Sequence, residues 1–245
     1  MQTSETKVTG QKRTIVAAVM ILFCIPLTIA IGILFLNDRS YYPISLMIIL
    51  FATLPFAMVF ESRKPQAREL VIIAVLVAIA VAGRTAFFMV PQVKPVIAIV
   101  IIAGVSLGAE SGFIVGALTG FVSNFIFGQG PWTPWQMFAF GIIGFLAGLL
   151  FSKGILSGKT LPLSIFGGLA AFMIYGLLLD TAAVMMFTST WTKASILSTY
   201  MLGVPFNLIH GASTILFLLI LSRPMTEKLT RIKKKYGLVE ERNDS

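Results

Sequence analysis

Apolar residues fill eight stretches of the chain, and short segments rich in polar residues, glycine or proline separate them. A helix needs about 20 predominantly apolar residues to cross a bilayer. Backbone polar groups find no water in the hydrocarbon layer, so such segments cross it as helices. The pattern therefore predicts an all-α integral membrane protein with about eight transmembrane helices, at residues 14–36, 43–60, 70–90, 95–107, 112–127, 136–151, 161–187 and 195–221.

Several of these stretches are short and contain regularly spaced small residues. The stretch 95–107 is short for a full crossing, and 112–127 and 136–151 are marginal. Residues four apart lie on one helix face, and small residues on that face allow close approach of a second helix. We therefore expect short helices that neighbours shield from lipid, packed through the glycines Gly108, Gly112, Gly116, Gly120, Gly144 and Gly148, with Asn124 continuing the first series.

The charge distribution predicts the orientation. Only 12% of the 245 residues are charged, about half the fraction of a soluble domain, so no separate soluble domain is expected. With eight spans, four of the nineteen basic residues fall on one face, and the others share the face of both termini. The positive-inside rule makes both termini cytoplasmic in a multi-pass protein of the cell membrane. The net charge of +9 needs no nucleic acid as partner, and the basic tail around 231–235 is expected to lie against anionic lipid headgroups.

An uncharged aromatic loop at 127–136 is the first candidate for ligand binding. It reads Phe-Gly-Gln-Gly-Pro-Trp-Thr-Pro-Trp-Gln and lies on the face with few charges. The loop could cover an apolar or aromatic ligand, or it could be a short rigid hairpin. Trp191 lies on the same face, as part of an interfacial aromatic belt or of a ligand-binding wall. The candidates from these segments are Gln129, Trp132, Trp135, Gln136 and Trp191.

Polar residues inside apolar segments form the second group of candidates. Ionisable groups within a membrane span are costly and indicate function unless they have structural partners. Asp180 could be a paired structural carboxyl, and His210 a hydrogen-bonded bundle residue. An intramembrane enzyme that uses these two would need further acids or metal ligands, which the sequence does not offer. The candidates are Arg84, Asn124, Asp180, Asn207 and His210.

The missing motifs exclude several classes of function. The chain has no Gly-x-x-x-x-Gly-Lys-Ser/Thr phosphate-binding loop, no His-Glu-x-x-His zinc motif and no cluster of acids for Mg²⁺. It has one histidine and no paired acids for general acid–base chemistry. We therefore expect a protein that is not an enzyme, has no catalytic residues, cofactor or metal site, and does not hydrolyse ATP itself.

Three motifs resemble one family of transporters. An alanine-spaced helix ends in Ala-Gly-Arg at 82–84 and is followed by Phe87-Phe88 and Pro91. Gly-Phe-Ile-Val-Gly-Ala-Leu stands at 112–118, before Ser123-Asn124, and Gly-Gln-Gly-Pro-Trp-Thr-Pro-Trp-Gln-Met stands at 128–137. With these motifs, the chain from about residue 68 to 222 resembles the substrate-binding S component of energy-coupling factor (ECF) vitamin transporters.

The resemblance implies a division of the chain and a set of partners. Residues 63–222 would form a six-helix substrate-binding core, preceded by 1–62 with an extra helical hairpin and followed by a basic cytoplasmic tail at 223–245. The core would bind a vitamin from outside and dock through Ala74, Ala78 and Ala82 on a membrane coupling (T) subunit, which two cytosolic ATPase subunits drive. The loop at 128–137 is most similar to that of cobalamin-type S components, so we expect cobalamin or another corrinoid, with another vitamin as the alternative. A stand-alone small-molecule permease is the alternative function.

Overall fold

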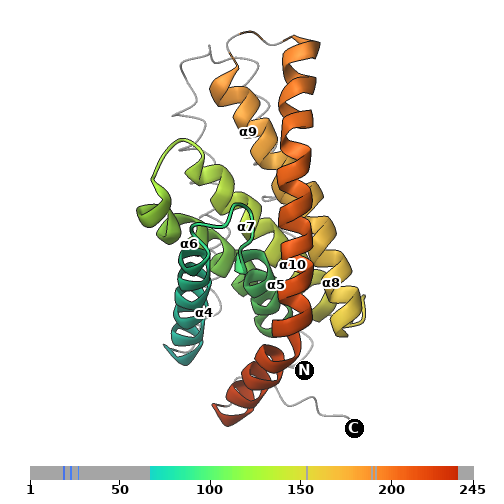
Figure 1. Cartoon of the computed structure of the whole chain (residues 1–245). Helices are drawn as coiled ribbons and strands as arrows, with labels where there is room; N and C mark the ends of the chain where they lie inside the picture. Colours follow the sequence, from blue (N-terminus) through green and yellow to red (C-terminus); the bar gives the residue numbers. More distant parts are fainter. Residues whose placement is uncertain are drawn as a thin grey trace.

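The computed structural model describes residues 67–236 except 153, 189 and 191, together with the isolated positions 19, 23 and 27. The first two expected spans, 14–36 and 43–60, therefore lie outside the described part, apart from those three positions. The elements are α4 (Ala67–Ala86), α5 (Val96–Leu107), α6 (Ala109–Phe127), α7 (Thr133–Ala147), the π-helical turn η2 (Gly148–Ser152), α8 (Thr160–Leu169), the π-helical turn η3 (Ala170–Gly176), α9 (Leu177–Phe187) and α10 (Lys193–Lys235) (Figure 1).

Most of the described residues are helical, and none of them lies in a strand. Within this described part, five helices are long and apolar enough to cross a membrane: Arg68–Ala86, Ala109–Phe127, Thr133–Ser152, Thr160–Phe187 and Lys193–Lys235. The helix Val96–Leu107 is shorter. The turn η2 continues α7 without a break, and the turn η3 joins α8 to α9 in the same way. The described part thus has the all-α membrane architecture and the six helical segments expected between residues 70 and 221.

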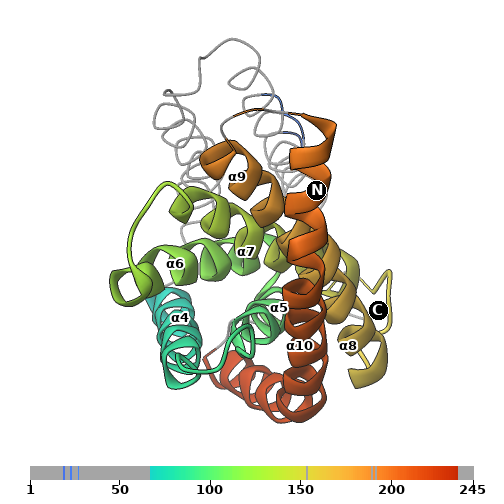
Figure 2. The same cartoon turned by 45° about the horizontal axis from the view of Figure 1, so that its top comes forward.

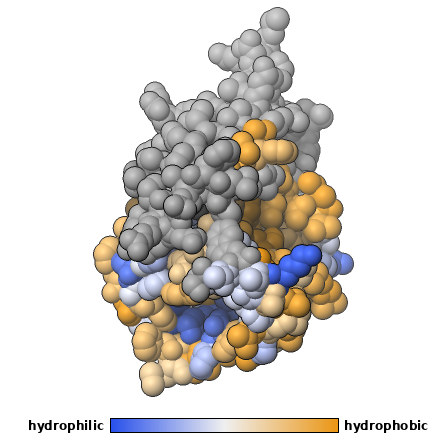
Figure 3. Space-filling model, turned by 90° about the horizontal axis from the view of Figure 1, so that it is seen from above, coloured by the Kyte–Doolittle hydropathy of each residue, from blue (hydrophilic) through white to orange (hydrophobic). Residues whose placement is uncertain are grey.

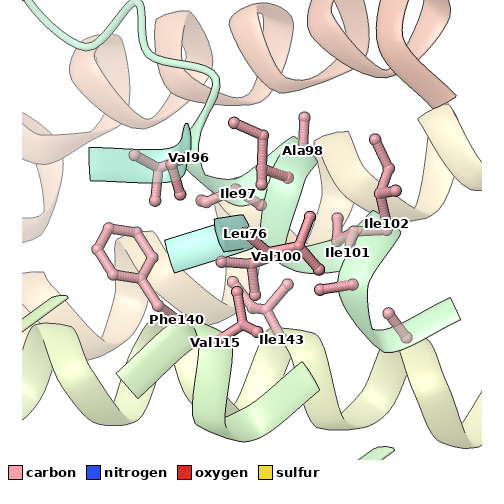
Figure 4. Close-up of a cluster of buried hydrophobic side chains, with 14 of the residues drawn as sticks. Leu76, Val96, Ile97, Ala98, Val100, Ile101, Ile102, Val115, Phe140 and Ile143 are labelled. Atoms are coloured by element: carbon pink, nitrogen blue, oxygen red, sulfur yellow. The ribbon is translucent and has the colours of Figure 1, made fainter. Parts of the chain in front are cut away.

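The short helix α5 lies at the centre of the bundle. It contacts α4, α6, α7 and α10, which surround it in Figure 2. Every residue from Val96 to Gly104 is buried. Twelve residues of α-helix span about 18 Å, less than the roughly 30 Å of hydrocarbon. Because protein rather than lipid covers α5, it need not span the hydrocarbon layer alone, which agrees with the expected shielding. Figure 4 shows its side chains packed with Leu76, Val115, Phe140 and Ile143.

Helices α6 and α7 approach each other through glycine. A Cβ atom added at Gly112 would overlap Gly144, and one at Gly120 would lie 3.0 Å from the Cα and N atoms of Met137. The expected close packing is therefore present. Gly108 differs from the rest of its series, because it separates α5 from α6 with a φ of 100°. The close approach brings the ends of α6 and α7 together near Arg84.

The outward faces of the helices are apolar. Leu161, Ile165, Leu169 and Met173 follow one face of α8 and η3 at helical spacing, and all are exposed. Figure 3 shows the end of the bundle where α9 ends and α10 begins, with separate hydrophilic patches on a largely apolar coloured surface. A water-soluble bundle would bury such residues, whereas lipid covers them in a membrane.

Helix α10 is longer than its apolar stretch. It begins at a capping box made by Thr192 and Ser195 and continues past residue 221 to Lys235. Its direction changes towards its C-terminal end, and its last turns pass beneath the bundle (Figure 1). Pro224 lies inside this helix. Leu229 is buried in the main core there, and Lys233 Nζ donates to the carbonyl of Ser106, 2.7 Å away, near the end of α5. We call this side of the bundle the basic end, and the opposite side, where α4 ends and α10 begins, the Arg84 end.

Candidate functional site

A hydrogen-bonded network joins three helices at the Arg84 end. Arg84, in the last turn of α4, donates from Nη1 to Ser123 Oγ and to Asn124 Oδ1 (2.9 Å), both on α6. Its Nη2 lies 3.5 Å from Gln136 Oε1 on α7. The Nδ2 atom of Asn124 donates to the same Gln136 oxygen and to Thr133 Oγ1, at 2.9 Å each. We call these five residues the Arg84 network. Arg84 and Gln136 are 52 positions apart in the sequence. Glycine packing brings α6 close to α7, so that Asn124 and Gln136 both reach Arg84.

Aromatic rings extend the site towards η3 and α10. The guanidinium carbon of Arg84 lies 4.3 Å from the ring centroid of Phe127. Phe140 stacks on Tyr175 with centroids 4.8 Å apart, and Tyr175 meets the ring of His210 edge-on at 4.8 Å. Gln136 Nε2 lies 3.4 Å from the Tyr175 hydroxyl and connects the rings to the network. The site thus combines aromatic rings with hydrogen-bonding groups, as small-molecule sites do.

Lys94 adds a second positive charge beside Arg84. It lies in the loop between α4 and α5, and its Nζ donates to the carbonyls of Phe87 (3.1 Å) and Val90 (2.9 Å). Nζ is also 5.8 Å from the Phe127 ring centroid. Partial burial, and then the charge of Arg84, lower the pKa of Lys94 from its ordinary value. No described carboxylate bonds to either cation, so this part of the site is positive.

Asp180 and Asn207 form a separate pair between α9 and α10. Asn207 Nδ2 donates to Asp180 Oδ2 at 2.7 Å. Small residues make room for the pair, because a Cβ atom at Gly203 would lie 2.5 Å from that Asp180 oxygen and one at Gly176 would lie 2.6 Å from Asn207 Cγ. Neither side chain bonds to the Arg84 network. The pair therefore fits the structural interpretation of Asp180, and His210 is not bonded to it.

Two of the four candidate side chains from the aromatic loop hold the loop itself. Gln129 Nε2 donates to the carbonyl of Phe121 (2.9 Å), and Trp132 Nε1 donates to the carbonyl of Gly128 (3.2 Å). Trp135 is buried in a second apolar cluster. Gln136 alone of the four nominated loop side chains reaches Arg84. Trp191 lies outside the described residues.

The alanine series lies on an exposed face of α4. Ala74, Ala78 and Ala82 are all exposed, while Leu76, Val77 and Ala80 on the other face are buried. This position leaves the small side chains open to a neighbouring helix within the membrane.

The sequence interpretation missed several members of the site. Ser123, Thr133, Phe127, Phe140, Tyr175 and Lys94 were not nominated. Tyr175 had a usable signal, because a buried tyrosine hydroxyl usually needs a hydrogen-bond partner. Phe127 and Phe140 had none, since each is one phenylalanine among 20.

Comparison with known proteins agrees with the architecture. The family model described as "ECF-type riboflavin transporter, S component" matches residues 64–227, more than half of the chain. No curated protein and no solved structure matches it. The family description mentions riboflavin, whereas the loop at 128–137 suggested cobalamin. The chain belongs to the family of ECF-type riboflavin transporter S components, multi-pass membrane subunits that bind substrate for an importer and work with a T component and ATPases.

Proposed function

We propose that this chain captures a flavin at the Arg84 end and delivers it inward as the substrate-binding subunit of its importer. The observation that carries the proposal is the row of Phe140, Tyr175 and His210 rings beside the Arg84 network. A flavin has a flat ring system for aromatic contact and polar edges for amide and hydroxyl groups. The family description, which names riboflavin, supports the same substrate.

The proposed direction of transport rests on charge. Arg68, Lys159 and the basic turns of α10 lie at the basic end, whereas Arg84, Lys94 and Lys193 lie at the other. The positive-inside rule supports a cytoplasmic basic end, with both chain termini in the cytoplasm. The substrate would then reach the Arg84 end from outside.

Energy for release would come from partners. We propose that the exposed alanines Ala74, Ala78 and Ala82 dock on the T component, since small side chains allow a second helix to approach closely. Two cytosolic ATPases would drive that component. The alternative of a stand-alone permease predicts uptake into liposomes that contain this chain alone.

A corrinoid is the second candidate substrate. The loop at 128–137 favours it through its resemblance to cobalamin-type S components. The loop also adjoins the site, because the hydroxyl of Thr133 links Gln129 to Asn124. Direct binding measurements distinguish the two ring systems.

The test is ligand binding by the purified full chain in lipid nanodiscs. Riboflavin should bind at nanomolar to micromolar concentration and lose fluorescence on contact with the aromatic rings, whereas cobalamin is titrated by calorimetry. Tyr175→Leu removes both the stacking and the hydroxyl and should weaken binding at least tenfold, about 1.4 kcal/mol. Phe125→Leu, at an exposed position on α6, is the matched control and should bind like the unmodified chain. Tight binding of cobalamin without binding of riboflavin would identify the substrate as a corrinoid instead of a flavin. If neither ligand binds, the proposal is contradicted.

A further inference from the structure

The positive charge of Arg84 is buried, and no described acidic side chain pairs with it. Only 7% of its surface is exposed, and its described hydrogen-bond partners, Ser123, Asn124 and Gln136, are all neutral. A buried cation is costly to desolvate unless an anion pairs with it. The nearby aromatic ring of Phe127 offsets part of this cost but supplies no net charge.

The guanidinium also has unused donors. It carries five N–H groups, and the hydrogen bonds within the described part of the chain use three of them. The Nε–H and one Nη2–H have no acceptor there. Nε and Nη2 share one edge of the planar group, and such an edge can match the two oxygens of a carboxylate or phosphate.

The group is held in place before any ligand arrives. Ser123 and Asn124 fix Nη1 from one side, Gln136 contacts Nη2, and the ring of Phe127 covers a face. A donor pair fixed in this way loses little conformational freedom when it binds an anion. The burial of Arg84 and its fixed position thus point to a specific partner rather than to a mobile surface cation.

Among the described residues, the surroundings of Arg84 add positive charge, and no acid bonds to it. Lys94 Nζ uses two of its three donors on the carbonyls of Phe87 and Val90. The charges of Lys94 and Arg84 both act on His210, whose buried ring has no hydrogen-bond partner among the described residues. Asp180, the acid inside the expected span 161–187, is bonded to Asn207.

We infer that the transported substrate carries an anionic oxygen group, a phosphate or a carboxylate, which binds the free edge of Arg84 beside Lys94. This inference rests on the proposed function, because it concerns the substrate of that same site. The anion would supply the charge that the described protein lacks, and the aromatic rings would take the remainder of the molecule.

The experiment compares ligands that differ only by the anionic group. Riboflavin, riboflavin 5′-phosphate and riboflavin 5′-hemisuccinate form one set, and cobinamide and cobinamide phosphate form the other. One of the two sets is expected to bind to the unmodified chain. Within that set, the ligand with the phosphate or succinate group should bind at least tenfold more tightly than the ligand without it. The flavin esters separate a preference for phosphate from a preference for carboxylate. This comparison needs no variant and so does not depend on whether a variant folds.

Variants then assign the preference to Arg84. Arg84→Gln should reduce the ratio between charged and neutral ligand to about one, while Arg84→Lys should keep part of it, since lysine has the charge but not the paired donors. Lys193→Gln, an exposed cation at the same end of the bundle, should leave the ratio unchanged.

The two proposals fail in different ways. If the neutral member binds as tightly as the charged one, the inference is overturned and the vitamin-binding function stands. A preference that survives in folded Arg84→Gln also overturns it. Size-exclusion chromatography and thermal unfolding show whether the chain is folded. If none of the five ligands binds to the folded chain, the proposed function fails, and the inference fails with it.

Discussion

Replacement of Gly116 by alanine should loosen the contact between α6 and α7 that supports the Arg84 network. The new methyl group would overlap the Phe140 carbonyl and lie 2.6 Å from the backbone nitrogen of Gly141. Ordinary contact is about 3.5 Å or more, so one helix must move by roughly 1 Å. Backbone atoms cannot rotate out of the way as a flexible side chain can. Overpacking of this kind typically costs about 1–3 kcal/mol of unfolding free energy.

The expected fall in Tm follows from that cost. For a chain of this size, each kcal/mol corresponds to about 2–4 °C, so Gly116→Ala should lower Tm by about 2–12 °C. The same movement separates Asn124 from Gln136, now 2.9 Å apart, so ligand affinity should fall as well.

The change in Tm is measured by thermal unfolding of the purified chain, with size-exclusion chromatography as the readout of unfolding. Gly158→Ala is the matched control, because a Cβ atom there meets nothing within 4 Å and its φ is outside the left-handed region. Its Tm should change by no more than about 1–2 °C. Equal Tm values for the two variants would refute the argument that backbone contact at Gly116 supports the α6–α7 interface.

Three further predictions test other parts of the molecule. Ala78→Trp should leave ligand binding intact and abolish uptake by the complete importer. The control Ile165→Trp, on the exposed face of α8, should keep both binding and uptake. Normal uptake by Ala78→Trp would argue against the docking face. Because the pKa of Lys94 is lowered, this group loses its proton at a lower pH than an ordinary lysine, so affinity for riboflavin 5′-phosphate should fall as pH rises from 8 towards 10. Lys94→Arg should flatten this pH profile, and an unchanged slope would exclude Lys94. Leu229→Ala should weaken the packing of the last turns of α10 by about 2–5 kcal/mol and speed amide hydrogen exchange there. The exposed control Thr230→Ala should leave exchange unchanged. Equal exchange rates in the two variants would contradict the argument that Leu229 holds these turns against the core.

The site could be predicted only in part. Polar residues in apolar segments are visible in any sequence, and this signal found Arg84, Asn124 and His210, which the structure places in or beside one cluster. The aromatic loop supplied Gln136. The same signal also selected Asp180 and Asn207, which bond to each other. Sequence position does not say whether two intramembrane polar groups will face a ligand or one another, because that depends on how their helices are rotated.

The candidate loop illustrates the same difficulty. Its tryptophans were nominated for their aromatic surface, yet Trp132 bonds within its own turn and Trp135 is buried in the core. Tyr175, which was not nominated, stacks on Phe140 at the centre of the site. Only the packing of η3 against α7 decides which aromatic rings lie beside the Arg84 network.

By itself, the sequence determined the membrane class, the positions of the six described helical segments, the end that carries more of the basic residues and the glycine-mediated packing of α6 on α7. These properties depend on local composition and spacing, which act within a turn or along a single helix. The tertiary structure alone decided that α5 is central, that α10 continues beneath the bundle and that Arg84 has no acidic partner within the described chain. Each of these depends on contacts between residues distant in sequence, and a buried charge acquires its meaning only from the groups that surround it.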